Sequence, residues 1–123
     1  MEIFDIKRGD ILVTKYNHIN DVELSRLERD YIIFIASGSK LSISSGNGYI
    51  CYSIPVMASI DLSNTLKIET KTNLSVGYTI YYIEKRKTTT IRKPNFSEMK
   101  ELINRLKENG YIYNRKCMKI CRA

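Results

Sequence analysis

Hydrophobic positions in the first 92 residues follow the pattern of β-strands rather than of helices. Residues 31–36 form a continuous apolar run that ends at the turn formers 37–39, which predicts a strand buried on both faces at the centre of a sheet. Residues 40–44 and 49–54 flank the turn formers 45–48, and this arrangement predicts a β-hairpin. Further strands are predicted at residues 11–16, 56–60, 66–69 and 78–84.

Local breakers mark where this β region turns or loses pairing. Gly9 lies in a predicted turn over residues 8–10, because glycine adopts positive φ without steric cost. Pro55 has no N–H to donate, so we expect strand pairing to weaken there. Residues 17–30 are polar, and their pattern leaves open a short helical turn capped by Asp21 or a long loop.

Residues 96–109 have the spacing of one amphipathic helix. Asn95 or Ser97 is its candidate cap, and Glu98 lies in the first turn, where a carboxylate interacts favourably with the helix dipole. Residues 110–123 then predict a short terminal strand or hairpin that returns to the sheet, beginning at a glycine that suits the helix end. The apolar stripe of the helix is predicted to consist of Phe96, Met99, Leu102, Ile103 and Leu106.

These elements together predict an α+β fold, in which a small antiparallel β-barrel or sandwich carries one C-terminal amphipathic helix followed by a short terminal strand or hairpin. The chain has 123 residues, of which 43% are hydrophobic, and we expect a single domain with a β body at 1–92, the helix at 96–109 and a terminal segment at 110–123. No apolar run approaches the roughly 20 residues that span a bilayer, and the first five residues lack signal-peptide features. We therefore expect a cytoplasmic protein that contacts no membrane.

Positive charge is concentrated in the C-terminal third. Residues 1–84 contain eight Lys/Arg and ten Asp/Glu, whereas residues 85–123 contain twelve Lys/Arg and three Glu, so the two parts carry net charges of −2 and +9. Such a segment binds phosphates through counterion release, docks on an acidic protein, or serves only as a solvated surface that aids solubility. The charge alone leaves these three interpretations open.

A candidate binding surface combines this charge with an aromatic side chain. Basic residues that follow the strand at 78–84 and basic residues on one flank of the predicted helix form one strip if the two elements lie side by side, and aromatic faces beside a basic groove are how single strands are bound. The predicted binding residues are Tyr81, Lys85, Arg86, Lys87, Arg92, Lys93, Lys100 and Lys107.

The residues that catalysis or metal binding needs are largely missing. His18 is the only histidine and lies in a polar stretch, so no Ser-His or Cys-His arrangement is indicated. Cys51, Cys117 and Cys121 are an odd number with neither zinc-site nor redox spacing. The glycines match no phosphate-binding loop. We therefore expect a non-enzymatic protein without catalytic residues, metal or cofactor.

Both ends of the chain resemble small orphan proteins of bacteriophages and mobile elements of gut bacteria. The resemblance lies in residues 4–13, with a Gly-Asp turn before the first strand, and in residues 96–114, with a helix followed by Gly110, Tyr111, Tyr113 and Asn114. It covers under a third of the chain. It implies a β-barrel-like fold with a C-terminal helix, in the cytoplasm of a bacterial host cell. It also implies an anti-CRISPR-like accessory factor that binds and inhibits a host protein or ribonucleoprotein complex, with or without direct RNA or DNA contact.

Residues 31–83 also resemble the jelly-roll N-terminal domain of AraC-type regulators, in which a strand, a Ser-Gly turn, a hairpin and further strands succeed each other. This resemblance implies a ligand-sensing or dimerisation domain. No helix-turn-helix pair follows in this chain, because one helix cannot supply that module. Two alternatives to the inhibitor therefore stay open, a regulator's sensory domain and an independent nucleic-acid-binding module.

Overall fold

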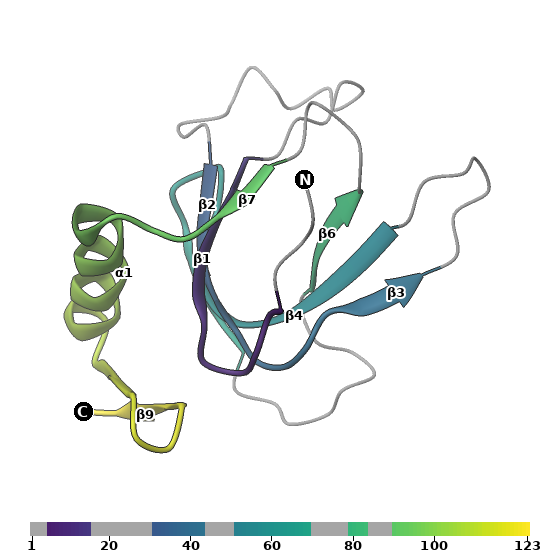
Figure 1. Cartoon of the computed structure of the whole chain (residues 1–123). Coiled ribbons are helices and arrows are strands. Elements are labelled where there is room, and N and C mark those ends of the chain that lie inside the picture. Colours follow the sequence, from purple (N-terminus) through teal and green to yellow (C-terminus); the bar gives the residue numbers. More distant parts are fainter. Residues whose placement is uncertain (1–4, 16–30, 44–50, 70–78, 84–89) are drawn as a thin grey trace.

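A computed structural model describes residues 5–15, 31–43, 51–69, 79–83 and 90–123 of the chain (Figure 1). These residues form an antiparallel sheet, one α-helix and a separate C-terminal hairpin, so the predicted α+β class is confirmed. No helix in the described ranges is long and apolar enough to cross a membrane.

Among the described residues the main sheet contains seven strands, all paired antiparallel. Its hydrogen-bonded path runs β3-β4-β2-β1-β7, while β5 and β6 pair with β4 outside this path. The strand at 31–36 therefore lies at the centre, as predicted. The strands are β1 (Ile11–Lys15), β2 (Tyr31–Ala36), β3 (Leu41–Ile43), β4 (Cys51–Ile60), β5 (Leu66–Ile68), β6 (Thr79–Ile83) and β7 (Thr90–Arg92).

Strand β4 continues through Pro55 and changes its partners there. Its first half pairs with β3 and β6, and its second half pairs with β2 and β5. A register shift against Ala36 marks a bulge next to this change, and the Pro55 carbonyl accepts a hydrogen bond from the Ser37 N–H at 2.9 Å. Proline thus marks a change of partner within one strand rather than a gap between two. The described strands curl but close no barrel.

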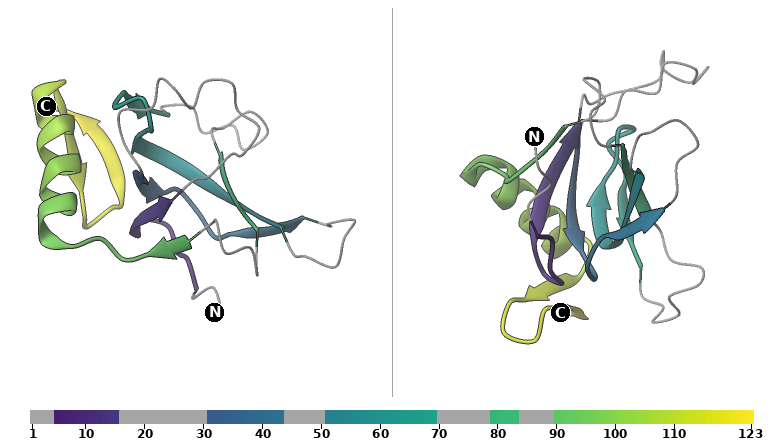
Figure 2. Two further views of the ribbon diagram at one scale, coloured as in Figure 1. Left: turned by 90° about the horizontal axis from the view of Figure 1, so that it is seen from above. Right: turned by 45° about the vertical axis from the view of Figure 1, so that its right-hand side comes forward.

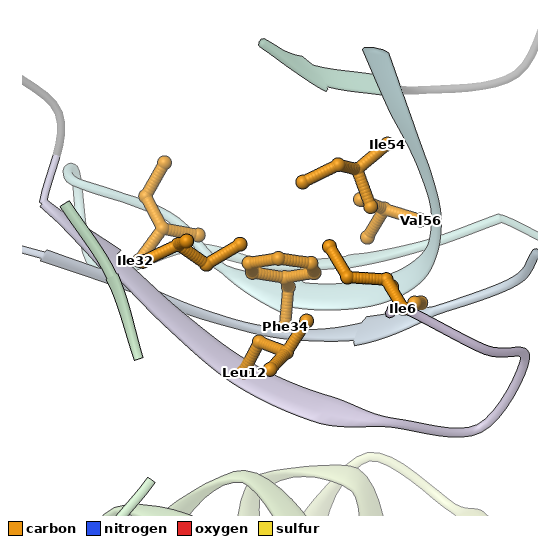
Figure 3. Close-up of a cluster of buried hydrophobic side chains, with 8 residues drawn as sticks. Ile6, Leu12, Ile32, Phe34, Ile54 and Val56 are labelled. Carbon is orange, nitrogen blue, oxygen red and sulfur yellow. The ribbon is translucent and has the colours of Figure 1, made fainter. Parts of the chain in front are cut away.

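Apolar side chains pack against both faces of the central strand. Phe34 is 0% exposed and points into the concave face of the curled sheet, among side chains from β1, β4 and the segment before β1 (Figure 3). Ile33 and Ile35 alternate with it and point to the opposite face. Because β2 is apolar on both faces, other elements have to pack against each face. The labelled residues of the concave cluster are Ile6, Leu12, Ile32, Phe34, Ile54 and Val56.

The helix and the hairpin pack on the face of the sheet opposite the concave one. Helix α1 (Phe96–Glu108) and the hairpin of β8 (Tyr111–Asn114) and β9 (Lys119–Arg122) lie side by side on the same face of the sheet (Figures 1 and 2). Leu102 and Leu106 of the helix are fully buried against that face. The predicted helix and the hairpin alternative are confirmed, but β8 and β9 pair only with each other, so the expected return into the main sheet is wrong.

Glu98 joins the last strand of the sheet to the start of the helix. Its carboxylate accepts two hydrogen bonds from the Arg92 guanidinium, both at 2.8 Å, and one from the Asn95 N–H at 2.9 Å. The Asn95 side chain accepts in turn from the Glu98 N–H at 2.8 Å, which completes a capping box. The sequence offered Asn95 or Ser97 as the cap, and Asn95 is the one used.

The β4–β5 turn fixes the other half of the helix. Asp61 accepts hydrogen bonds from the N–H and hydroxyl of Ser63 and from the Thr65 N–H, and it pairs with the Lys67 ammonium at 3.2 Å. Burial raises the pKa of this carboxyl, but these hydrogen bonds and the nearby ammonium outweigh it, so the pKa lies below 3.8. Asn64 belongs to the same turn, and its carbonyl accepts a hydrogen bond from the guanidinium of Arg105 in α1 at 2.9 Å.

We expect Glu98→Ala to destabilise the protein by about 2–3 kcal/mol, because it removes a helix cap and leaves Arg92 without its carboxylate. Urea unfolding monitored by circular dichroism measures this change. Glu108→Ala is the matched control, since Glu108 is exposed in the last helical turn, and it should shift stability by no more than about 0.5 kcal/mol. Equal effects of the two substitutions contradict the role of Glu98.

We expect Asp61→Asn to be less stable than the wild type by about 1–2 kcal/mol at neutral pH. The Asp61 pKa is lower in the folded chain than in the unfolded chain, so the carboxylate stabilises the fold above about pH 4 and loses this effect as pH falls through the folded pKa. Urea unfolding between pH 7 and pH 2.5 should therefore show the difference shrinking below pH 4. A difference that stays constant over this range contradicts the assignment.

Candidate binding surface

Part of the predicted binding surface lies outside the described residues. Lys85, Arg86 and Lys87 belong to the ranges that the structure does not describe. Tyr81 belongs to β6, where its backbone pairs opposite Ser53 of β4, and its side chain is likewise outside the described part. Their proposed role in binding stays a prediction.

The described part of β6 does not lie beside the helix. Strand β6 pairs with the first half of β4, whereas α1 packs on the far side of β1 and β2 (Figures 1 and 2). The predicted strip joins the basic residues after this strand to a flank of the helix, and those residues lie outside the described part. This strip therefore stays a prediction.

Arg92 is engaged within the fold. Its guanidinium forms the two hydrogen bonds with Glu98, and it lies 5.7 Å from the centre of the Tyr31 ring. The hydrogen-bonded carboxylate of Glu98 raises the pKa of Arg92 above its ordinary value. Arg92 therefore joins the sheet to the helix, while half of its side chain stays exposed, and its role in binding stays a prediction.

The remaining predicted lysines are exposed on or next to the helix. Lys93 precedes the helix cap, and Lys100 and Lys107 are two turns apart on the helical face that points away from the sheet. None of the three has an ion-pair partner among the described residues. The structure therefore keeps these three cations available to another molecule.

The cations of the terminal hairpin belong to the basic C-terminal third, although they are not among the individually predicted binding residues. Strands β8 and β9 partly bury Tyr111, Tyr113 and Ile120 against the sheet. The register places Lys119 on the opposite, outward face, whereas Arg122 pairs with Tyr111 and lies on the same face as Ile120. Arg115 and Lys116 lie in the connecting turn. The exposed hairpin cations are Arg115, Lys116, Lys119 and Arg122.

Helix and hairpin together form what we call the basic surface, made of Lys93, Lys100, Lys107, Arg115, Lys116, Lys119 and Arg122. Residues 90–123 contain nine Lys/Arg and three Glu, net +6, whereas the other described residues contain five Lys/Arg and four Asp/Glu, net +1. The Arg115 guanidinium reaches the Met99 sulfur at 3.2 Å, which connects the hairpin turn to the first part of the helix. Most of the net positive charge of the described residues therefore lies in the segment that contains the helix and the hairpin.

Phe96 departs from the predicted apolar stripe. Its side chain is 80% exposed, while Leu102 and Leu106 from the same stripe are fully buried. Around the helix axis Phe96 lies about 120° from Leu102, so its ring is turned away from the face that packs on the sheet. The apolar spacing correctly predicted the helix, but the inclusion of Phe96 in the packed stripe is wrong.

Candidate metal ligands do not gather among the described residues. No group of three or more His, Cys, Asp or Glu side chains within the described ranges is placed to hold a metal ion. Cys117 and Cys121 are free thiols on the exposed hairpin, and His18 is outside the described part. No family model matches the chain, and no curated protein or solved structure is significantly similar to it.

The hairpin is attached to the turn before β1. The Tyr113 hydroxyl donates to the Gly9 carbonyl at 2.9 Å, and burial raises the pKa of this hydroxyl above 10.0. Gly9 has φ +91°, and a Cβ there would lie 2.8 Å from the Tyr113 oxygen and 2.9 Å from the Met118 side chain. The positive φ favours glycine at this position, and a Cβ would displace the side chains of Tyr113 and Met118.

We expect Gly9→Ala to destabilise the protein more than Gly110→Ala. Both glycines have positive φ, so alanine costs about 1 kcal/mol at each, but only the Cβ at position 9 meets other atoms within 4 Å. The extra loss for Gly9→Ala, measured by urea unfolding, reports the packing of the hairpin on the body. If the two variants lose equal stability, the hairpin is not held at this turn.

Proposed function

We propose that this chain is a non-enzymatic accessory factor of a phage or mobile element, which binds and inhibits a host protein or ribonucleoprotein complex through its basic surface. The observation that carries the proposal is the exposure of seven cations on one helix-hairpin unit without an ion-pair partner among the described residues. Surface charge of one sign attracts an anionic partner and increases its rate of association.

The attachment of this unit supports binding rather than a role in solubility alone. The helix is held at its start by the Glu98 junction and further along by Arg105, and the hairpin is held at Gly9. A surface that is ordered before it meets a partner loses less conformational entropy on association. A solvated basic tail needs no such attachment, because its charge acts in any conformation.

The origin of the proposal is the resemblance at the two ends of the chain, and their contact supports it. Residues 4–13 contain Gly9, and residues 96–114 contain Tyr113, the two residues that share the 2.9 Å hydrogen bond. The resembling segments therefore meet in space, which favours their interpretation as parts of one motif.

The sensory-domain alternative has less support from the described residues. Its hallmark is an apolar cavity inside the sheet, but Phe34 and Ile54 fill the described concave face. A pocket of about 230 Å³ lies instead beside β4 and β5, where Lys67 and Glu69 line it. This volume is below the roughly 300 Å³ at which small-molecule pockets usually begin.

We expect the triple variant Lys100→Glu, Lys107→Glu, Lys119→Glu to lose its partner, with retention from extract of the source cells reduced on the order of tenfold or more. Affinity capture with the tagged full chain and quantitative mass spectrometry measures this retention. The control Lys100→Arg, Lys107→Arg, Lys119→Arg keeps the charges and should retain the same components, as should Lys7→Glu in the β body. Retention of those components by the Glu triple variant contradicts the proposed function.

A further inference from the structure

The outer face of α1 combines lysines with small polar side chains. Ser97, Lys100, Asn104 and Lys107 are all exposed and follow each other at intervals of three, four and three residues. At 100° per residue these four positions fall within an arc of about 80°, opposite Leu102, and the two lysines are about 10.5 Å apart along the axis. We call these four residues the helix ridge.

Phe96 lies at the start of this ridge. Lys100 follows it by four residues and Met99 by three, so both are its neighbours on the helix surface. The Arg115 guanidinium contacts the Met99 sulfur at 3.2 Å. A lysine of the ridge and an arginine of the hairpin therefore lie in the same region of the surface as the exposed phenyl.

The fold does not need this phenyl ring. Its side chain is 80% exposed, and the start of the helix is already specified by the Asn95–Glu98 capping box. An exposed aromatic ring on a surface rich in cations fits a partner that has both a flat apolar surface and negative charge. An unpaired nucleobase with its phosphate has both in one unit.

We infer that the helix ridge and Phe96 bind a single-stranded polynucleotide, with a base stacked on the phenyl ring and phosphates beside Lys100, Lys107 and Arg115. This inference rests on the proposed function and names the part of the host machine that the basic surface contacts. An acidic protein fits less well, because lysine is depleted in the cores of protein interfaces, where an exposed aromatic anchor normally lies. A duplex fits less well, because its bases are not free to stack on a side chain.

Fluorescence anisotropy with labelled oligo-dT, oligo-rU and a mixed-sequence duplex, each at several salt concentrations, tests the inference on the full chain. We expect both single strands to bind more tightly than the duplex. Phe96→Ala should weaken single-strand binding about 5- to 150-fold without changing its salt dependence, which corresponds to the loss of one stacked base. Lys100→Glu, Lys107→Glu should instead reduce the salt slope, because phosphate contacts are lost.

Three further variants separate stacking from other causes. Ile112→Ala truncates another exposed apolar side chain, 46% exposed on the hairpin, and should leave binding unchanged. Phe96→Leu keeps an apolar side chain without a π face and should bind as weakly as Phe96→Ala, whereas Phe96→Trp should restore binding. The chain contains no tryptophan, so Phe96→Trp also places a single reporter whose fluorescence a stacked base should quench.

Tight duplex binding, an unchanged affinity of Phe96→Ala, or a loss with Ile112→Ala equal to that with Phe96→Ala overturns the inference. Absence of single-strand binding also overturns it. In that case the proposed function still holds if the charge-reversed triple variant loses a partner that the arginine variant retains. If the charge-reversed variant keeps every captured component as well, both proposals fail.

Discussion

The buried carboxylate of Glu98 is the constraint on which the C-terminal third depends. It is 7% exposed and binds the guanidinium of Arg92 in β7 and the backbone N–H of Asn95 at once. A buried carboxylate without such partners is strongly unfavourable, so the strand end, the cap and the first helical turn have to adopt one arrangement. That arrangement directs the helix across the face of the sheet on which Leu102 and Leu106 pack.

Strand β2 is apolar on both faces, and the helix and hairpin that follow the sheet in the chain bury the second face. The curl of the strands covers the concave face, but Ile33 and Ile35 on the other face remain open to water until helix and hairpin pack on them. Burial of such side chains contributes about 1.5–3 kcal/mol each. The helix and the hairpin that bury these side chains also carry the basic surface. One segment therefore both stabilises the fold and presents the charge.

Local signals predicted much of this fold, and long-range contacts account for what they missed. The apolar run at 31–36, the paired segments around 45–48 and the Asn95 cap each depend on neighbouring residues, and they were predicted correctly. The pairing of Arg92 with Glu98 and the exposure of Phe96 depend on how the helix is placed on the sheet, which no pattern along the chain contains. The site prediction named Arg92, which pairs with Glu98 but keeps half of its side chain exposed, and did not single out the hairpin cations. The role of Lys85, Arg86 and Lys87 stays a prediction.

Amine footprinting reports whether the cations of helix and hairpin meet an anionic partner. The full chain is acetylated with a limiting reagent, alone and in extract of the source cells, and the modification of each lysine is quantified by mass spectrometry. We expect Lys93, Lys100, Lys107, Lys116 and Lys119 to become protected in the extract, while Lys7 on the β body reacts equally in both. Equal reactivity of all these lysines, or protection of Lys7 alone, would contradict it.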